Sequence, residues 1–206
     1  DTSLHTGRGL GTIVSDILVQ PDQKIVIGGI FSTYDAVPAG YIVRINPDGS
    51  IDPSWNAGLG ANGAVDKLTL QPDGKILIGG DFTMYGGNGV NFLQFRLARA
   101  NSDGSRDTTF SQAGASRSVR SIVVKPNNKI LIGGRFTYYE SVLKNRIACL
   151  FPGGTLDMFQ TGTGANEDIE DLILLHDQKI VIAGEFTNFN NYPAGRVARL
   201  MSDGTF

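Results

Sequence analysis

One phrase decides the fold of this chain: Pro72-Asp73-Gly74-Lys75-Ile76-Leu77-Ile78-Gly79-Gly80. Close variants of it occupy three other segments, 21–29, 126–134 and 176–184. The lysines of the four copies lie 51, 54 and 50 residues apart, at Lys24, Lys75, Lys129 and Lys179. A period of about 50 residues with strand-like content is typical of propeller blades and β-solenoid coils. The repeat therefore predicts the architecture before any single residue predicts a function.

A second phrase follows each copy of the first. In the second repeat it reads Arg99-Ala100-Asn101-Ser102-Asp103-Gly104, and its other copies begin at Arg44, Cys149 and Arg199. The opening residues, 1–4, match the segment 107–110, which completes the second phrase. The chain ends inside the fourth copy of this phrase, so its first residues supply the part of the repeat that its last residues lack. We expect four repeats cut at one phase, in a mature product or an excised part of something longer.

Both phrases predict hairpins. Pro-Asp-Gly suits a type I turn followed by a residue with positive φ, the three-residue hairpin loop with a G1 bulge. The positive-φ position falls on Gly74, Asn128, Gln23 and Gln178 in the first phrase. Apolar runs flank these turns and predict first strands at 14–20, 65–71, 119–125 and 169–175, and second strands beginning at each lysine. Third strands are expected at 41–46, 93–101, 146–151 and 196–201, with a short fourth strand after each Asp-Gly turn.

These elements predict an all-β fold, a β-propeller built from four antiparallel blade repeats of about 50 residues. We expect a single repeat domain over 1–206, with blades at 14–64, 65–118 and 119–168, and a last blade made by 169–206 with 1–13 completing it. No window keeps a 3.6-residue apolar period, so helix should be nearly absent. Four repeats could close a ring alone, form part of a larger ring, or share one with a second chain.

Composition narrows the classes of partner. The chain has 206 residues, 27 glycines, 18% charged residues and a formal net charge of −2. Without a lysine or arginine cluster, nucleic acid is not an expected partner. No apolar stretch reaches the roughly 20 residues that span a bilayer, so membrane insertion is not expected. One cysteine, Cys149, permits no internal disulfide, and we expect a buried, inert thiol.

Catalytic, cofactor and metal motifs are weak. Gly58-Leu59-Gly60-Ala61-Asn62-Gly63 matches a dinucleotide fingerprint as text, but a strand rather than a helix should follow it. The Asx-rich segment 46–52 lacks the ligands of an EF-hand, and turn chemistry accounts for it. Two histidines and one cysteine build no zinc set, and no serine stands in a nucleophile elbow. We expect no cofactor, no metal and no catalytic residue, although a triad from distant segments or paired carboxylates stay alternatives.

Recurring arginines admit two interpretations. Arg44, Arg99 and Arg199 share one repeat position, and Arg96, Arg146 and Arg196 share another. They could line a channel that binds an anion. The structural interpretation is that their stems pack between blades while their guanidinium groups pair with carboxylates such as Asp52 and Asp107, and we favour it.

Ligand-binding candidates come from residues that the repeat does not explain. Aromatic residues present in every copy should serve the blade, whereas single-copy aromatics and amides are free to bind a ligand. The second repeat also carries a four-residue insertion around Gly86, and insertions in repeat proteins map to loops on one face. The predicted ligand-binding residues are Trp55, Asn88, Asn91, Phe92, Tyr138, Asn190, Asn191 and Tyr192.

The segment Gln-Pro-Asp-Gly-Lys-Ile-Leu-Ile-Gly-Gly-Asp-Phe-Thr at 71–83 resembles the delta-60 repeat family, as does the phrase at 196–204. The resemblance covers all four repeats. It implies a β-propeller in large secreted or surface proteins of bacteria, with no catalytic or ligand residues to carry over. The chain departs from the pattern at Tyr41, Cys149 and Gly153.

From these observations we expect a non-catalytic binding or adhesion module of a secreted or surface protein, contacting a glycan or a protein through loops on one face. The first alternative is a structural building block or spacer of a fibre, filament or phage-like particle, with self-association to complete a ring or fibre. The second is a polysaccharide-acting enzyme, which would place two carboxylates about 5 to 9.5 Å apart in a cleft.

Overall fold

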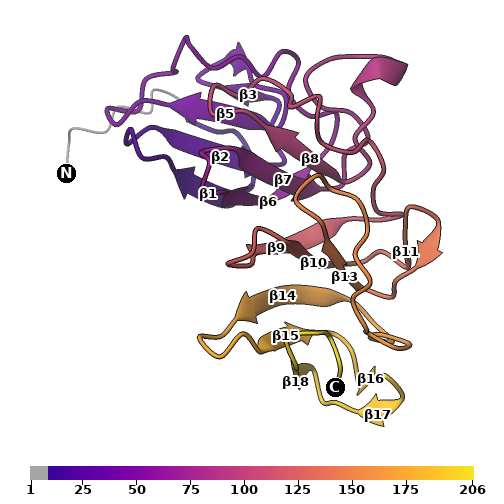
Figure 1. Ribbon diagram of the computed structural model, residues 1–206. Helices are drawn as coiled ribbons and strands as arrows, with labels where there is room; N and C mark the ends of the chain where they lie inside the picture. The colour runs from indigo at the N-terminus through magenta and orange to yellow at the C-terminus, as the bar shows by residue number, and fades with distance from the viewer. Residues whose placement is uncertain (1–8) are drawn as a thin grey trace. The chain divides into compact units, whose positions relative to one another are not determined.

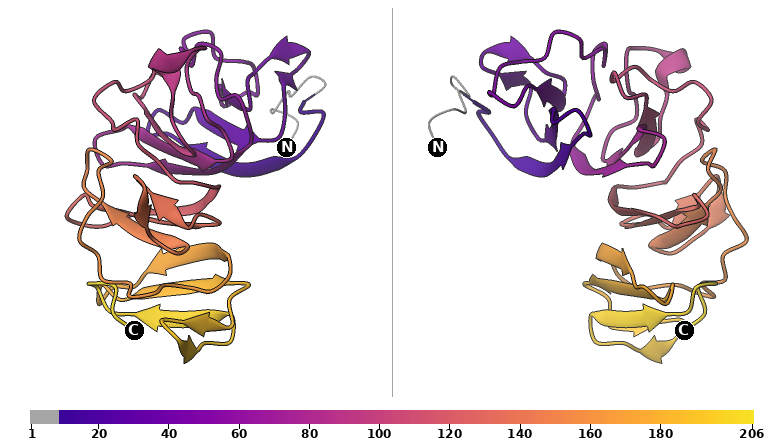
Figure 2. Two further views of the ribbon diagram at one scale, coloured as in Figure 1. Left: turned by 90° about the vertical axis from the view of Figure 1, so that its right-hand side faces the viewer. Right: turned by 60° about the vertical axis from the view of Figure 1, so that its left-hand side comes forward.

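Every repeat of the chain folds into a small antiparallel sheet, which confirms the all-β prediction (Figures 1 and 2). The structure is a computed structural model and describes residues 9–206, Val90 by its backbone alone. Residue contacts divide the chain into two compact units, Asp1–Thr108 (unit 1) and Thr109–Phe206 (unit 2). The predicted closure of the last blade by residues 1–4 lies outside the described residues.

Unit 1 holds the sheets of the first two repeats, with strand orders β1-β2-β5 and β6-β7-β8. The strands of the first repeat are β1 (Val14–Val19), β2 (Ile25–Gly29), β3 (Thr33–Tyr34), β4 (Val37–Pro38) and β5 (Ile42–Ile45). Those of the second are β6 (Val65–Leu70), β7 (Ile76–Gly80) and β8 (Leu97–Ala100), with the 3₁₀ turn η1 (Val90–Phe92) in the insertion.

Unit 2 repeats this arrangement, with strand orders β9-β10-β13 and β14-β15-β18. Its third repeat has β9 (Val119–Val124), β10 (Ile130–Gly134), β11 (Tyr138–Tyr139), β12 (Val142–Leu143) and β13 (Ile147–Leu150). The fourth has β14 (Ile169–Leu174), β15 (Ile180–Gly184), β16 (Asn188–Phe189), β17 (Tyr192–Pro193) and β18 (Val197–Leu200). The second strands β7 and β10 are buried along their whole length, as predicted from their continuous apolar runs.

The turns form as their residues predict. Gln23, Gly74, Asn128 and Gln178 all adopt positive φ, between 62° and 82°. In the second phrase, the glycines at 49, 104, 154 and 204 have φ between 89° and 96°. The conformation at Gln23 and Gln178 shows that the hairpin register can impose positive φ on a glutamine.

Two features of the predicted blade are wrong. The third strands are shorter than expected, because Tyr41, Arg96, Arg146 and Arg196 adopt positive φ and β5, β8, β13 and β18 begin after them. In the first three repeats the expected fourth strand is one bridge, Ile45 to Ile51, Ala100 to Arg106 or Leu150 to Leu156. It ends there because the chain turns at the next aspartate, where Asp52 Oδ1 accepts the N–H of Ser54 at 3.0 Å.

Short hairpins that the sequence did not predict stand beside three of the sheets. They are β3–β4, β11–β12 and β16–β17, each with two strands of two residues. Their two-residue turns, Asp35-Ala36, Glu140-Ser141 and Asn190-Asn191, have positive φ at both positions. This is the type I′ turn, and only the Asn-Asn pair is a favourable sequence for it.

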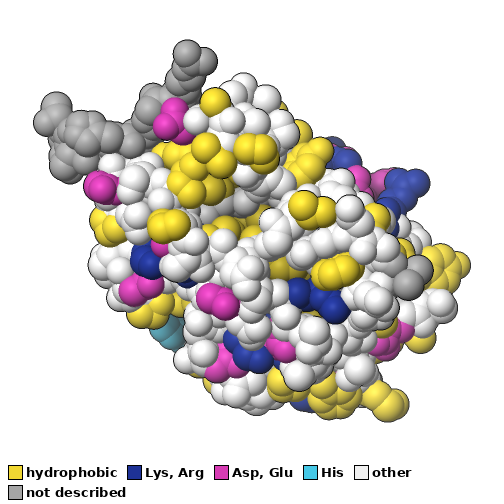
Figure 3. Space-filling model, turned by 90° about the horizontal axis from the view of Figure 1, so that it is seen from above, with side chains coloured by type: hydrophobic (Ala, Val, Ile, Leu, Met, Phe, Trp, Pro, Cys, Tyr) yellow, Lys and Arg dark blue, Asp and Glu magenta, His cyan; other side chains and the backbone are white. Residues whose placement is uncertain are grey.

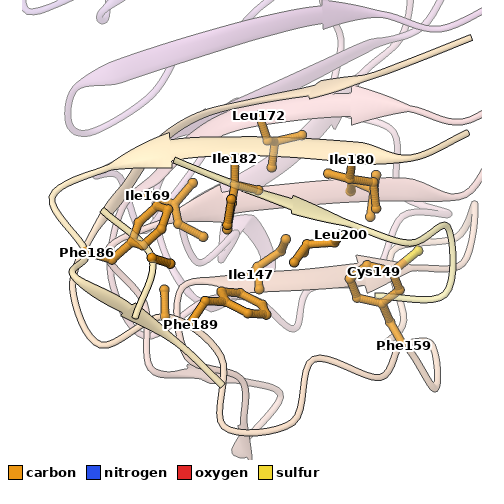
Figure 4. Close-up of a cluster of buried hydrophobic side chains, with 14 residues drawn as sticks. Ile147, Cys149, Phe159, Ile169, Leu172, Ile180, Ile182, Phe186, Phe189 and Leu200 are labelled. Atoms are coloured by element: carbon orange, nitrogen blue, oxygen red, sulfur yellow. The ribbon is translucent and has the colours of Figure 1, made fainter. Parts of the chain in front are cut away.

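Within each unit, the first strand of one blade packs on the sheet before it. A Cβ atom at Gly28 would lie 2.5 Å from Cγ1 of Val65, so glycine permits the close approach of β2 to β6. In unit 2 the buried cluster between the sheets includes Ile147, Leu172, Ile182, Phe186 and Phe189 (Figure 4). The core of each unit therefore lies between its blades as well as inside them.

Candidate functional site

Two of the sequence candidates, Asn190 and Asn191, form the turn of hairpin β16–β17, with φ of 52° and 67°. The Oδ1 atom of Asn190 accepts a hydrogen bond from the N–H of Thr163 at 3.0 Å. The N–H of Asn190 donates to the carbonyl of Gly164 at 2.8 Å. These bonds anchor the hairpin to the loop that precedes β14.

The same hairpin borders a cleft of about 290 Å³ in unit 2. Its polar lining is dominated by amide and hydroxyl groups, from Thr137, Asn145, Thr163, Asn166, Asn188 and Asn191. We call it the amide-lined cleft. Such groups both donate and accept hydrogen bonds without changing charge near neutral pH.

Hydrogen bonds hold several of these amides in fixed orientations. Asn166 Oδ1 accepts from the N–H groups of Thr187 and Asn188 at 3.0 and 2.9 Å. Asn145 Nδ2 donates to the carbonyl of Thr163 at 2.7 Å. A ligand would thus meet polar groups whose positions are set before it binds, which lowers the entropic cost of binding.

The arginine in the cleft is ion-paired. Arg146 lines it, and its Nε lies 3.1 Å from Oδ1 of Asp168, whose Oδ2 lies 2.9 Å from Nε of Arg135. Arg146 Nη1 also donates to the carbonyl of Arg135 at 3.1 Å. Arg146 thus pairs with a carboxylate, as the structural interpretation of the arginines predicts, and it shares this carboxylate with Arg135.

Two exposed tyrosines each come directly after a cleft residue in the chain. Tyr138 follows Thr137 on β11, and Tyr192 follows Asn191 on β17; both rings are exposed. The Tyr192 ring centroid lies 6.0 Å from that of Phe206. The two tyrosines are thus neighbours of the cleft residues in the chain.

Trp55 has a different environment, in unit 1. A Cβ atom at Gly104 would lie 2.6 Å from its ring, and the guanidinium carbon of Arg44 lies 4.8 Å from the ring centroid. In unit 2, Phe110 and Phe159 pack in the same way under Gly154 and Gly204. The aromatic residue of this repeat position thus supports the Asp-Gly turn of the next blade, and ligand binding by Trp55 stays a prediction.

The insertion candidates also belong to unit 1. Asn88 and Asn91 are exposed, whereas Phe92 is half-buried, with its ring against Gly87 and 5.4 Å from the guanidinium carbon of Arg106. The structure therefore groups Asn191 with the cleft of unit 2 and leaves the insertion as a separate candidate surface.

The sequence did not identify most residues of the amide-lined cleft, because blade packing brings them together from separate loops. One signal was present for Asn145. Its repeat position is held by Gly40, Phe95 and Gly195 in the other copies, so the asparagine is specific to the third repeat. The same rule, that residues unexplained by the repeat are free for function, applies to polar residues as well as aromatics.

A second cavity lies at Cys149, where the third repeat lacks the arginine that the other repeats carry. In unit 1, Arg44 Nε lies 2.7 Å from Oδ2 of Asp52, which confirms the predicted pairing. Where Cys149 replaces the arginine, a cavity of about 450 Å³ is lined by Lys125, Lys129 and Asp157 among others. Burial and then the charge of Asp157 raise the pKa of the Cys149 thiol to about 11, so the thiol is buried as predicted and protonated at neutral pH.

Three further observations concern charge, metals and membrane-spanning helices. On the face in Figure 3, acidic and basic side chains are interspersed among hydrophobic ones. Residues 9–206 contain no cluster of three or more histidine, cysteine or acidic side chains placed to hold a metal ion. In the same part of the chain, no helix has the length and apolar character needed to cross a bilayer.

The repeats match a known family model four times, over residues 20–54, 71–110, 125–159 and 177–206. The family is described as a domain of unknown function (DUF5122) beta-propeller. The chain belongs to this family. Each match contains both repeat phrases, so the DUF5122 assignment and the blade assignment rest on the same residues. The match supports a β-propeller repeat family, and the delta-60 name stays a resemblance.

Solved structures confirm the fold of this DUF5122 chain. The WD40 β-propeller domain of Doa1 shares 15% identity at a TM-score of 0.57, over 84% of this chain and 48% of that one. PorZ, a bacterial surface component of the type-IX secretion system of Porphyromonas gingivalis, shares 12% identity at a TM-score of 0.53, over 94% of this chain and 26% of that one. The chain spans less than half the length of either protein. No curated protein matches it.

Proposed function

We propose that this chain is a non-catalytic binding module that holds a neutral glycan in the amide-lined cleft of unit 2. The observation that carries the proposal is the lining itself, to which six amide and hydroxyl side chains contribute. Sugar hydroxyls pair with amides as donors and acceptors at once, and the apolar face of a sugar ring stacks on an aromatic ring.

The chemistry of the lining supports binding rather than catalysis. Asparagine and threonine side chains neither gain nor lose a proton near neutral pH, and the arginine in the cleft is ion-paired. A glycoside hydrolase would need two carboxyl groups facing the bound sugar. The proposed role is therefore recognition without turnover.

A secreted or cell-surface location belongs to the same proposal. PorZ, one of the propeller proteins to which the chain is similar, is a bacterial surface component, and the resemblance to the delta-60 repeats implies the same location. A module that binds glycans outside the cell would display the cleft toward polysaccharide or glycoprotein.

The test is a glycan array probed with the 206-residue chain and with two variants. We expect retention of a defined set of neutral glycans by the chain and loss of that set by Asn191→Ala. Asn88→Ala is the matched control, an exposed amide of the unit 1 insertion. Binding that survives Asn191→Ala and disappears with Asn88→Ala would move the site to the insertion, and the absence of any bound glycan would overturn the proposal.

A structural role is the second candidate function, and one observation favours it. The first and last blades each expose an apolar sheet face whose equivalents are buried inside the units. Such faces suit a building block that associates with further copies.

A further inference from the structure

The outer face of the first blade is exposed in the part of the chain that the structure describes. Ile17 on β1 is 58% exposed, whereas its repeat equivalents Leu68 and Leu172 are 4% and 2% exposed. Val14 is exposed as well, although its equivalents Val65 and Ile169 are fully buried. Because the four positions carry the same kind of side chain, the difference lies in what covers them.

The contact that buries these equivalents is visible inside each unit. Val65 and Leu68 pack against Gly28 of the preceding blade, and Ile169 and Leu172 pack against Gly133. The N–H of Leu68 also donates to Asp16 Oδ2 of the preceding blade at 2.8 Å. In each unit, the surface that buries these side chains is thus the sheet face of the preceding repeat.

The fourth blade exposes such a sheet face within the described residues 9–206. Val197 on β18 is 58% exposed, whereas its equivalents Ile42 and Ile147 are 2% and 0% exposed. Arg199 is exposed too, although Arg44 at the same position is buried and its Nη1 donates to the carbonyl of Ser102 in the next blade at 2.5 Å. The two uncovered faces are therefore the two halves of the contact that joins blades inside the units.

We propose that the uncovered face of the first blade, formed by Val14 and Ile17, binds the uncovered face of the fourth blade of a second copy of this chain. Val14 then lies against Ala183 as Val65 lies against Gly28. Arg199 of one copy donates to the carbonyl of Pro47 in the other, as Arg44 donates to Ser102. The contact joins two unlike faces, so it is heterologous.

Two sequence differences between the repeats weaken this contact. Ala183 carries a methyl group where Gly28 has none, and a Cβ atom at Gly28 would lie 2.5 Å from Cγ1 of Val65, so Val14 must move away or change rotamer to receive it. Asp171 stands at the position of Asp16, so the register brings Asp171 of one copy beside Asp16 of the other. Asp171→Ser copies Ser121, whose Oγ accepts the N–H of Leu172 at 3.1 Å without a charge, and should therefore strengthen the contact.

Cross-linking tests the register directly. A Cβ atom at Gly28 would lie 3.2 Å from Cβ of Val65, close to the roughly 3.5–4.5 Å of a disulfide. Chains with Val14→Cys, mixed with tagged chains carrying Ala183→Cys and oxidised gently, should give a mixed dimer on a non-reducing gel. The unsubstituted chain, whose Cys149 is buried, should give none. A cross-link that forms within one chain of the double variant, and not between chains, would overturn the proposal.

Sedimentation velocity tests the same contact without cross-linking. We expect association that increases with concentration, and Ile17→Asp and Val197→Asp should each raise the dissociation constant of the contact at least about a hundredfold, because a buried unpaired charge is costly. Leu59→Asp, at a 61% exposed position outside both faces, is the matched control. A monomer at all concentrations, or equal loss in the control, would contradict the proposal.

Discussion

The carboxylate of Asp52 shows how one repeat position holds a blade together. Its Oδ2 lies 2.7 Å from Nε of Arg44 and 3.0 Å from Nζ of Lys24, so it joins β2 and β5 to the turn that follows them. Burial alone would raise the pKa of Asp52, but the bonds from Lys24, Ser54 and Arg44 outweigh it and hold the pKa far below its usual range. The ionised form is therefore part of the folded state.

We predict that this carboxylate contributes to stability above pH 4 and that the contribution is lost as pH falls. The folded pKa lies below the unfolded value of about 4, so the unfolded chain takes up the proton first and acid favours unfolding. Asp52→Ala should lower the free energy of unfolding at pH 7 by about 3 kcal/mol, because it leaves Arg44 buried without its partner. Urea titrations between pH 3 and pH 7 measure both effects.

The exposed Asp22 is the control for that series, and Asp22→Asn should leave the unfolding free energy nearly unchanged. In Asp52→Ala the dependence on pH should also be weaker than in the unsubstituted chain. An Asp52 variant as stable at pH 7 as the unsubstituted chain would contradict this account of the ion pair.

Cys149 gives a second prediction at the scale of the residue. Its thiol is 1% exposed and its pKa is raised to about 11, so at pH 8 the reactive thiolate should be about a hundredfold scarcer than in the unfolded chain. Alkylation by iodoacetamide, followed by mass spectrometry, should therefore be at least that much slower in buffer than in urea. As the chain has one cysteine, the signal has one source. Equal rates in the two solvents would place the thiol at the surface.

Among the elements, the Asp-Gly turn and the aromatic ring beneath it join one blade to the next. The ring of Trp55 leaves no room for a Cβ atom at Gly104, whose φ is 91°. The backbone continues the contact, because the N–H of Asn56 donates to the carbonyl of Asp103 at 2.7 Å. Gly74 has a similar φ of 82° but open space around it.

This difference predicts unequal costs for the same substitution. Gly74→Ala should cost about 1 kcal/mol, the strain of positive φ alone. Gly104→Ala should cost clearly more and shift the fluorescence of Trp55, because the methyl group displaces the ring. Thermal unfolding and tryptophan emission of the two variants measure the pair, and equal costs would show that the ring does not support the turn.

The elements also show what the sequence could predict. Repetition revealed the main strands and turns, because Ile, Val and Leu alternate with Pro, Asp and Gly at a fixed period. Hairpins such as β3–β4 escaped notice because Asp35-Ala36 carries no turn signal, and their conformation comes from packing. In the cleft, Asn191 stood out as a single-copy amide beside Tyr192, whereas Thr137 and Thr163 meet it only once the blades pack.

For the whole molecule, the repeats give each unit its stability and the departures from the repeat supply its functional surfaces. Positions shared by the copies build the blades, as Asp52 and Arg44 do. Positions that differ between copies, such as Asn145 and Asn191, line the amide-lined cleft. The exposed faces of the first and fourth blades are a third kind of position. Their residue types are shared with the other copies, but the side chains are exposed where those of the other copies are buried.

Hydrogen–deuterium exchange of the full chain, with and without the best-retained glycan of the array, tests the central claim most directly. Protection on binding should be confined to peptides that cover 137–146, 163–166 and 187–192, which contain the cleft lining and its hairpin. Peptides that cover the insertion at 86–92 should exchange equally in both samples. Protection of the insertion with no change around the cleft would contradict the assignment of the glycan site to unit 2.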